Sequence, residues 1–302
     1  MFHRILVPLD GSPLGEYALP YALTIGRKSR ADVHVAQVHV PDAYNDYDYA
    51  HSDELEAEAK SREVQYLDGL RRKMTKAFDG PLHIHHLEGL VPETLASEVV
   101  DQGIDLVVMN AHGWGYVSRS IMGSVSDYLM RHLTVPLLVM HSQQPTARLD
   151  RDLSFGRILI CLDGSPLAET ILGSVSSLAQ LWHSQCHLLR VVAPPDHLGE
   201  PRDEQQMTLC KHACDKATGD ARAYLETVAN RFRGEIPGVK TNVVLSRQVA
   251  KAILHEAHRI ECDLIAIATH GRGGVSRLVL GNVADKVVRG AETAVLVFHP
   301  AP

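Results

Sequence analysis

ILVPLDGSPL at residues 5–14 is nearly repeated as ILICLDGSPL at residues 158–167. A second pair of related segments follows, LVVMNAHGWGYVSRSIMGSV at 106–125 and LIAIATHGRGGVSRLVLGNV at 264–283. The copies begin 153 residues apart in the first pair, at positions 5 and 158, and 158 residues apart in the second, at positions 106 and 264. A period of this length indicates a duplicated globular domain of about 150 residues, rather than a short solenoid repeat.

Composition is typical of folded domains and excludes several classes of protein. Of the 302 residues, 45% are hydrophobic and 22% are charged, as in globular proteins. The net charge of −6 argues against nonspecific binding to nucleic acid or to anionic membranes. No apolar run reaches the roughly 18–20 residues that span a bilayer, and MFHRILVPLD lacks the apolar core of a signal peptide. The five cysteines all lie in the second half and are odd in number, so we expect a reduced, cytoplasmic protein.

Each half alternates short β-rich runs with helical stretches. The runs predict strands in the first half at 4–8, 33–40, 82–87, 105–110 and 136–140, and in the second half at 157–162, 186–192, 240–245, 263–268 and 294–298. Alternating strands and helices predict right-handed crossovers and a parallel sheet. We therefore expect two tandem doubly wound α/β domains, each a five-stranded parallel sheet with helices on both faces. The predicted domains are 1–141 and 156–302, joined by the polar linker 142–155.

The repeated segments both lie at carboxyl ends of predicted strands, where open α/β sheets bind their ligands. Asp10 and Asp163 end the first strand of each half. Ser12 and Ser165 follow, and a tight turn with a helix N-cap explains these serines without any ligand. That explanation accounts less well for the aspartates, which stand at the mouth of the predicted crevice.

The second repeated segment predicts a phosphate site. In the first half nine residues separate Gly113 from Gly123-Ser124, and in the second half nine separate Gly271 from Gly281-Asn282. Glycines let the backbone approach a ligand, and free N–H groups at a helix N-terminus attract anions. We expect valine at Gly123 or Gly281 to occupy phosphate space and weaken binding without unfolding the protein.

On these segments both halves resemble universal stress protein domains, and the whole chain except the linker resembles the tandem form of that family. Its ATP-binding members carry G-x2-G-x9-G-[S/T] after the fourth strand and an aspartate after the first. The resemblance implies an adenine-nucleotide alpha hydrolase-like fold and an ATP site, with Mg²⁺ accompanying the nucleotide. Asp10 and Asp163 would contact the adenine or ribose side, and Val40 and Val191 would offer backbone contacts to adenine. The phosphates would be held by Gly113, Gly123, Ser124 and Val125 in the first half, and by Gly271, Gly281, Asn282 and Val283 in the second.

The chain departs from the family's pattern at the first glycine, which is Asn110 in one half and Ala268 in the other. Asparagine tolerates a left-handed backbone better than alanine does. If that conformation is needed, the first half is the less compromised. Asn282 also replaces the hydroxyl residue that Ser124 supplies. We expect nucleotide in both halves, with the first favoured.

The resemblance also implies that the fifth strands, 136–140 and 294–298, pair the halves into an internal pseudo-dimer, which removes an exposed apolar edge. Two separate domains are the alternative, and a homodimer of chains is a further option; no protein partner can be named.

Histidines at 83, 85 and 86 and the pair Cys210/Cys214 raise the question of a metal. Neither group repeats or offers four ligands at zinc-finger spacing, so we expect none. His112 and His270 recur in equivalent loops, where they could contact nucleotide or transfer a proton, although satisfied loop histidines are the simpler explanation.

Three functions stay open at this stage. The first is an ATP-binding stress-response protein, a sensor or regulator with at most slow ATP hydrolysis. The second is a ligand-free interaction scaffold. The third is an ATP-using enzyme of the same fold, such as an adenylating synthase. That class places Ser-Gly-Gly-x-Asp-Ser after the first strand, where this chain has Asp-Gly-Ser-Pro.

Overall fold

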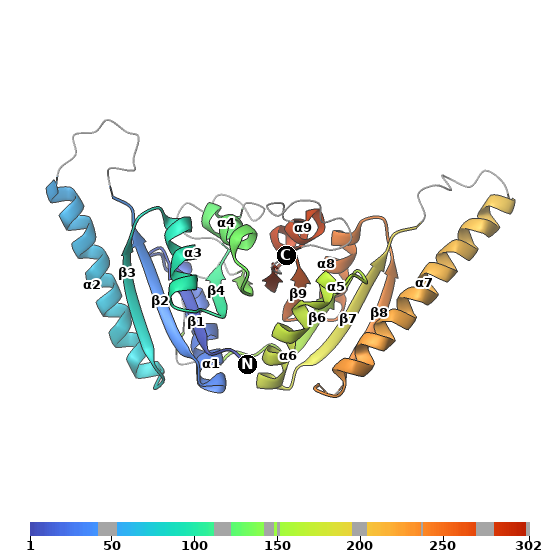
Figure 1. Cartoon of the computed structure of the whole chain (residues 1–302), viewed down its shortest axis with the longest axis horizontal. Coiled ribbons are helices and arrows are strands. Elements are labelled where there is room, and N and C mark those ends of the chain that lie inside the picture. Colours follow the sequence, from blue (N-terminus) through green and yellow to red (C-terminus); the bar gives the residue numbers. More distant parts are fainter. Residues whose placement is uncertain are drawn as a thin grey trace. The chain divides into compact units, whose positions relative to one another are not determined.

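The computed structural model describes residues 1–41, 53–111, 122–141, 148–149, 152–194, 204–236, 238–269 and 281–299. By their internal contacts these divide into two compact units, Met1–Ser154 and Phe155–Pro302. Each unit alternates strands and helices as its sequence predicts (Figure 1).

The first unit is built around strand β1, whose last five residues are buried. Its elements are, in chain order, β1 (Arg4–Leu9), the 3-10 helix η1 (Gly15–Ala18), α1 (Leu19–Ser29), β2 (Asp32–His39), α2 (Asp53–Ala77), β3 (Leu82–Glu88), α3 (Val91–Asp101), β4 (Leu106–Asn110), α4 (Ser124–His132) and β5 (Leu137–Met140). The strands lie in the order β3-β2-β1-β4-β5, and every pairing between them is parallel. The strand order therefore reverses between β1 and β4.

The second unit repeats this order. Its elements are β6 (Arg157–Cys161), α5 (Pro166–Glu169), α6 (Ile171–Trp182), β7 (Gln185–Val192), α7 (Glu204–Phe232), β8 (Lys240–Leu245), α8 (Val249–Arg259), β9 (Leu264–Ala268), α9 (Asn282–Gly290) and β10 (Ala294–Phe298). The order β8-β7-β6-β9-β10 is again parallel throughout and reverses between β6 and β9.

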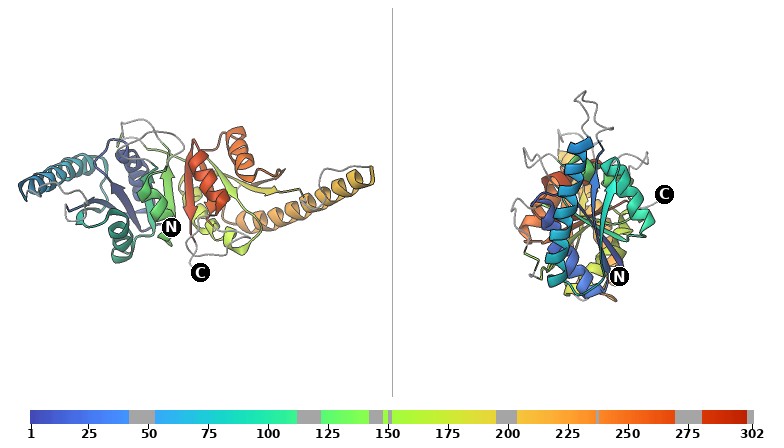
Figure 2. Two further views of the ribbon diagram at one scale, coloured as in Figure 1. Left: turned by 90° about the horizontal axis from the view of Figure 1, so that it is seen from above. Right: turned by 90° about the vertical axis from the view of Figure 1, so that its left-hand side faces the viewer.

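Helices cover both faces of each sheet, because right-handed crossovers change face where the strand order reverses. In the first unit α1 and α2 share a face, since the Arg27 guanidinium donates to the carbonyl of Ala77 at 2.8 Å. On the other face α3 contacts α4. The long helices α2 and α7 lie along the outer strands β3 and β8 of their own units (Figures 1 and 2). The predicted fold class, two tandem doubly wound α/β units, is confirmed.

The described end of the predicted linker contacts the units on either side. Asp152 accepts from the Arg27 guanidinium at 2.5 Å, and the Leu153 N–H donates to Thr24 at 3.3 Å, both within the first unit. Phe155 is buried in the second unit, edge-on to Trp182 with 5.1 Å between ring centroids. The boundaries 1–141, 142–155 and 156–302 stay predictions.

Candidate functional site

The turn after β1 holds Asp10 by backbone hydrogen bonds. Gly11 has φ of 77°, a left-handed conformation that glycine adopts without strain. The chain then turns back, and the Ser12 N–H donates to Oδ1 of Asp10 at 2.9 Å. Ser12 Oγ in turn accepts from the Gly15 N–H at 2.9 Å. The serine therefore caps the following turn, as the ligand-free explanation predicts, and the aspartate has a structural role as well as any role in binding.

The second unit repeats this turn in detail. Gly164 has φ of 86°. The Ser165 N–H donates to Oδ1 of Asp163 at 2.8 Å, and Ser165 Oγ accepts from the Ala168 N–H at 3.1 Å as the N-cap of α5. Equivalent hydrogen bonds in both copies fix both carboxylates at the carboxyl ends of β1 and β6.

Helix α4 begins where the predicted phosphate site lies. Gly123 is its N-cap, and its N–H donates to the carbonyl of Ala111 at 3.1 Å. This bond joins the helix N-terminus to the end of β4, next to Asn110. Within the described part of the chain no side chain caps α4, so its first-turn N–H groups, which have no partner within a helix, face the strand ends.

These features enclose a cleft of about 230 Å³ in the first unit. It lies between β1 and β4, at the point where the strand order reverses. Five of the predicted site residues line it: Asp10, Asn110, Gly123, Ser124 and Val125. The other walls come from β1, β4, α3 and Gly15, whose lack of a side chain leaves room for the Asp10 carboxylate 2.7 Å from the position of a Cβ. The Asp10 carboxylate, the Asn110 amide and the N–H groups at the start of α4 thus meet at one apolar-walled cleft.

The remaining predicted residues of the first half lie elsewhere. Val40 follows β2 by one residue and does not line the described cleft. Gly113, like His112, lies outside the described residues. The structure therefore brings together five of the seven residues predicted for this half.

In the second unit the corresponding residues occupy equivalent elements. Ala268 ends β9, Gly281 is the N-cap of α9, and Asn282 and Val283 open that helix. The Gly281 N–H donates to the carbonyl of Thr269 at 2.9 Å, the counterpart of the bond made by Gly123. Val191 lies within β7, at the position that corresponds to Val38 of β2 rather than to Val40. Gly271 and His270 lie outside the described residues.

The argument that favoured Asn110 over Ala268 was wrong in its premise. Both residues belong to strands, and neither has a positive φ. The backbone at this point of the motif is extended, a conformation that any residue adopts. A preference for the first half must rest on other features.

One such feature is the side chain beside the turn, which differs between the units. Gln37 of β2 lies next to Gly11, with its amide nitrogen 3.5 Å from the position of a Cβ there. At the equivalent place in β7, the Arg190 guanidinium lies 2.9 to 3.0 Å from the Cβ position of Gly164. Arg190 also stacks over the Tyr224 ring at 5.0 Å. The second unit therefore has a bulky cation where the first has a neutral amide.

A repeated tyrosine–glutamate pair was not predicted from the sequence. The Tyr66 hydroxyl of α2 donates to Glu16 at 3.0 Å, and Tyr224 of α7 donates to Glu169 at 3.0 Å. Burial, and then the neighbouring carboxylate, raise the pKa of Tyr66. Each pair attaches a long helix to the segment that follows the aspartate turn. A glutamate six residues after Asp10 and after Asp163 was the available signal.

A hollow of about 580 Å³ in the second unit lies at the amino edge of that unit's sheet. It is lined by Arg157, Gln185 and Lys240, which begin β6, β7 and β8. Amino ends of strands are not where doubly wound sheets bind nucleotides, so this hollow is separate from the site at the carboxyl edge.

A doubly wound unit with a cleft at its switch point is an architecture with which many α/β proteins bind nucleotides. The family model described as "Universal stress protein family" matches residues 1–141 and again 154–299. The chain therefore belongs to the universal stress protein family and carries two copies of its domain.

Similar proteins agree with this assignment. A universal stress protein of Mycolicibacterium smegmatis is 28% identical over 69% of this chain and 67% of its own length. A universal stress protein of Mycobacterium bovis is 24% identical over 97% of this chain and 94% of its own length. For three other mycobacterial relatives, each 25% identical, the match covers 61% of the relative's length.

A solved universal stress protein from Archaeoglobus fulgidus superimposes with a TM-score of 0.69 at 18% identity, covering 99% of this chain and 96% of that one. A putative universal stress protein from Pseudomonas aeruginosa gives a TM-score of 0.65, also at 18% identity, over 99% and 94% of the two chains. At this identity the similarity shows the fold. Among the described residues, no helix combines the length and apolar character needed to cross a membrane.

Proposed function

We propose that this chain is a cytoplasmic stress-response protein that binds ATP in its first unit and acts as a nucleotide-dependent sensor or regulator. The observation that carries the proposal is the cleft at the β1/β4 switch point, where Asp10, Asn110 and the α4 N-terminus converge. Family membership supports the same assignment.

Each wall of the cleft suits one part of a nucleotide. The partial positive charge at the α4 N-terminus attracts phosphate oxygens, and the Ser124 hydroxyl adds a donor. The Asp10 carboxylate accepts from ribose hydroxyls or the adenine amine. Mg²⁺ would accompany the triphosphate through phosphate oxygens and water. In the second unit the same helix start is present, but Arg190 lies against the turn, so we propose weaker or different binding there.

The two alternatives differ in what they require of the cleft. A ligand-free scaffold needs no converging donors, and the aspartate–serine turn alone would satisfy it. An ATP-using enzyme needs a group positioned for chemistry. The described residues of the cleft include one carboxylate, and Asp10 is already bonded to the Ser12 N–H. We therefore propose hydrolysis far below the roughly 1–1000 turnovers per second of typical enzymes.

Calorimetry on ligand-stripped protein tests the proposal. ATP with Mg²⁺ should bind with a dissociation constant in the micromolar range or weaker, roughly −8 kcal/mol or less favourable. AMP should bind more weakly, because it lacks the phosphates that the α4 N-terminus would hold. No heat with either nucleotide, or equal affinity for both, would reject the phosphate site. A phosphate-release assay on the same sample should give less than about one turnover per second.

We also propose, from the family resemblance, that the two units pair into an internal pseudo-dimer. Small-angle scattering should then give a radius of gyration of about 19 Å, the value expected for one compact body of 302 residues. The value should not change with concentration if the chain is a monomer. A two-lobed profile would show that the units are separate.

A further inference from the structure

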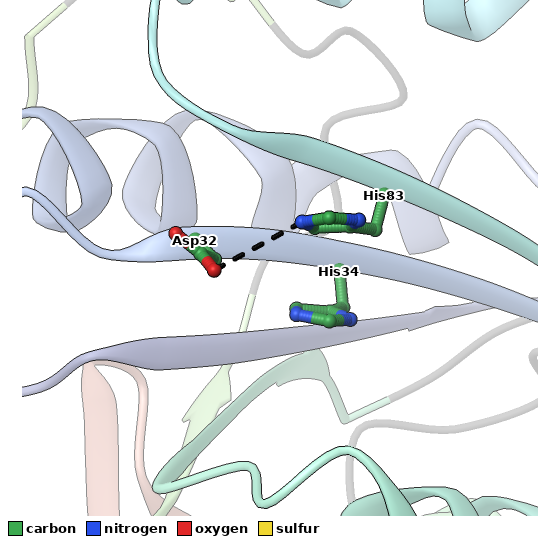
Figure 3. A group of neighbouring side chains, drawn as sticks. All are labelled: Asp32, His34 and His83. Atoms are coloured by element: carbon green, nitrogen blue, oxygen red, sulfur yellow. Dashed lines mark ion pairs between the residues drawn. The ribbon is translucent and has the colours of Figure 1, made fainter.

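Histidines from β2 and β3 gather at the amino end of the first unit's sheet, away from the nucleotide cleft. In the parallel register His34 lies opposite His83. Asp32 and His34 share one face of β2, because alternate strand residues point the same way. One ligand atom from each of Asp32, His34 and His83 lies within 4.8 Å of the others. Figure 3 shows the two rings roughly parallel, with Asp32 beside one end of them.

His34 is held by its neighbour His85 on β3. Nδ1 of His34 and Nε2 of His85 are 3.0 Å apart, a hydrogen-bond distance between the two rings. The Glu98 carboxylate of α3 lies 3.0 Å from Nδ1 of the same His85 ring, at ion-pair distance. The contact with His85 therefore engages Nδ1 of His34 and leaves Nε2 as the other ring nitrogen.

Nε2 of His34 has no hydrogen-bond partner in the described structure. His34 is 4% exposed, and its Nε2 is buried and unbonded. A buried polar atom without a partner is costly. An imidazole whose first nitrogen is held by a neighbouring side chain can offer its second nitrogen to a metal ion.

We propose that Asp32, His34 and His83 bind a divalent transition-metal ion such as Zn²⁺, with His85 positioning His34. Imidazole and carboxylate are zinc ligands at about 2.0–2.2 Å, and three protein ligands leave a position for water. The three side chains must draw together to reach those distances. The side chains of His83 and Asp32 are 48% and 37% exposed, so both can rotate toward buried His34.

The second unit keeps a histidine at the place of His34 but not the other two ligands. His187 occupies the place of His34 and pairs in register with Lys240, where the first unit has His83. Gln185 takes the place of Asp32, and Asn242 donates to Glu256 at 2.7 Å as the counterpart of the His85–Glu98 pair. Lys240 is positively charged and repels a metal ion, and Gln185 lacks the negative charge that Asp32 offers. Among the described residues, this arrangement of three ligands therefore occurs in the first unit.

Sequence spacing did not predict this site, because its ligands come from two strands that are far apart in the chain. His83 and His85 are visible as an alternating pair, but their partners on β2 are identified by the register. Arg4, the cation at the start of β1, donates to the carbonyl of Gln102 at 2.9 Å.

Zinc titration of the full chain tests the site, with affinity measured by competition against a chromophoric chelator. The background should carry Cys210→Ser and Cys214→Ser, because these thiols lie four residues apart on α7 and could bind zinc themselves. One zinc per chain should bind. His83→Ala and Asp32→Asn should each weaken binding at least tenfold.

The matched control is His86→Ala, on the same strand but the opposite face, where His86 contacts Glu63 at 2.7 Å. It should bind zinc like the parent, and ATP affinity should be unchanged in every variant. His83 is exposed, so its replacement should leave the protein folded, whereas replacement of the buried His34 could unfold it. Zinc binding that is absent in the parent, or equal in the parent, His83→Ala and Asp32→Asn, would overturn the proposal.

Discussion

Replacing Gly281 with valine should lower the melting temperature of the second unit by about 10 °C, equivalent to about 3 kcal/mol. A Cβ at this position would lie 2.4 Å from the carbonyl oxygen of Thr269. That oxygen is a backbone atom and already accepts the Gly281 N–H at 2.9 Å. This changes the expectation, drawn from the sequence, that valine at Gly281 would affect binding alone.

Neither side of this contact can move easily. Thr269 is 1% exposed, its N–H donates to Phe298, and its hydroxyl lies 2.9 Å from Nδ1 of His299. On the other side α9 is anchored by its buried residues Ala284, Val287 and Val288. The strain must therefore be relieved by breaking the bond between the helix start and the strand end.

Scanning calorimetry of thermal unfolding measures this change, because it can resolve two units that unfold separately. Gly123→Ala is the matched control, since a Cβ there meets the carbonyl of Ala111 at 3.4 Å. It should cost less than about 1 kcal/mol. Equal melting temperatures for Gly281→Val and Gly123→Ala would mean that the contact at Thr269 is not as close as described.

The fold was predictable because its signals are local and occur twice. Buried parallel strands read as continuous apolar runs, and β1, β4, β6 and β9 all do so. The turn after β1 was predictable for the same reason, since an aspartate, a glycine with positive φ and a capping serine are adjacent in sequence. Here the structure adds only the hydrogen bonds.

The parts of the site that could not be predicted depend on contacts across the fold. Tyr66 meets Glu16 from a helix 50 residues later, and the contacts among Glu98, His85 and His34 join three elements. Conformation was a second limit. The motif suggested a left-handed backbone at Asn110, whereas the end of β4 is extended. The reason for glycine at Gly281 is the nearby Thr269 carbonyl, which pattern and spacing do not reveal.

Gly123→Val should abolish or weaken ATP binding to the first unit by at least tenfold, with a smaller effect on AMP. Gly123 lines the proposed cleft and caps α4 with φ of −61° and ψ of 147°, values that valine adopts readily. Its Cβ would lie 3.4 Å from the Ala111 carbonyl and 3.8 Å from the Ser126 hydroxyl. The added methyl groups should therefore occupy phosphate space rather than collide with the backbone.

Calorimetric titration and a melting curve should be recorded on the same sample, with Gly123→Ala as the smaller step between glycine and valine. If both units bind ATP in the parent, the valine variant should lose one equivalent and keep the other. If the first unit binds alone, no heat should remain. Gly281→Val is expected to lower stability, and Gly123→Val is expected to lower ATP affinity. The equivalent glycines of the two repeats therefore distinguish a glycine needed for backbone packing from one needed for phosphate binding. Unchanged ATP affinity in folded Gly123→Val protein would show that the α4 N-terminus does not hold the phosphates, and the ligand-free scaffold would then explain the site better.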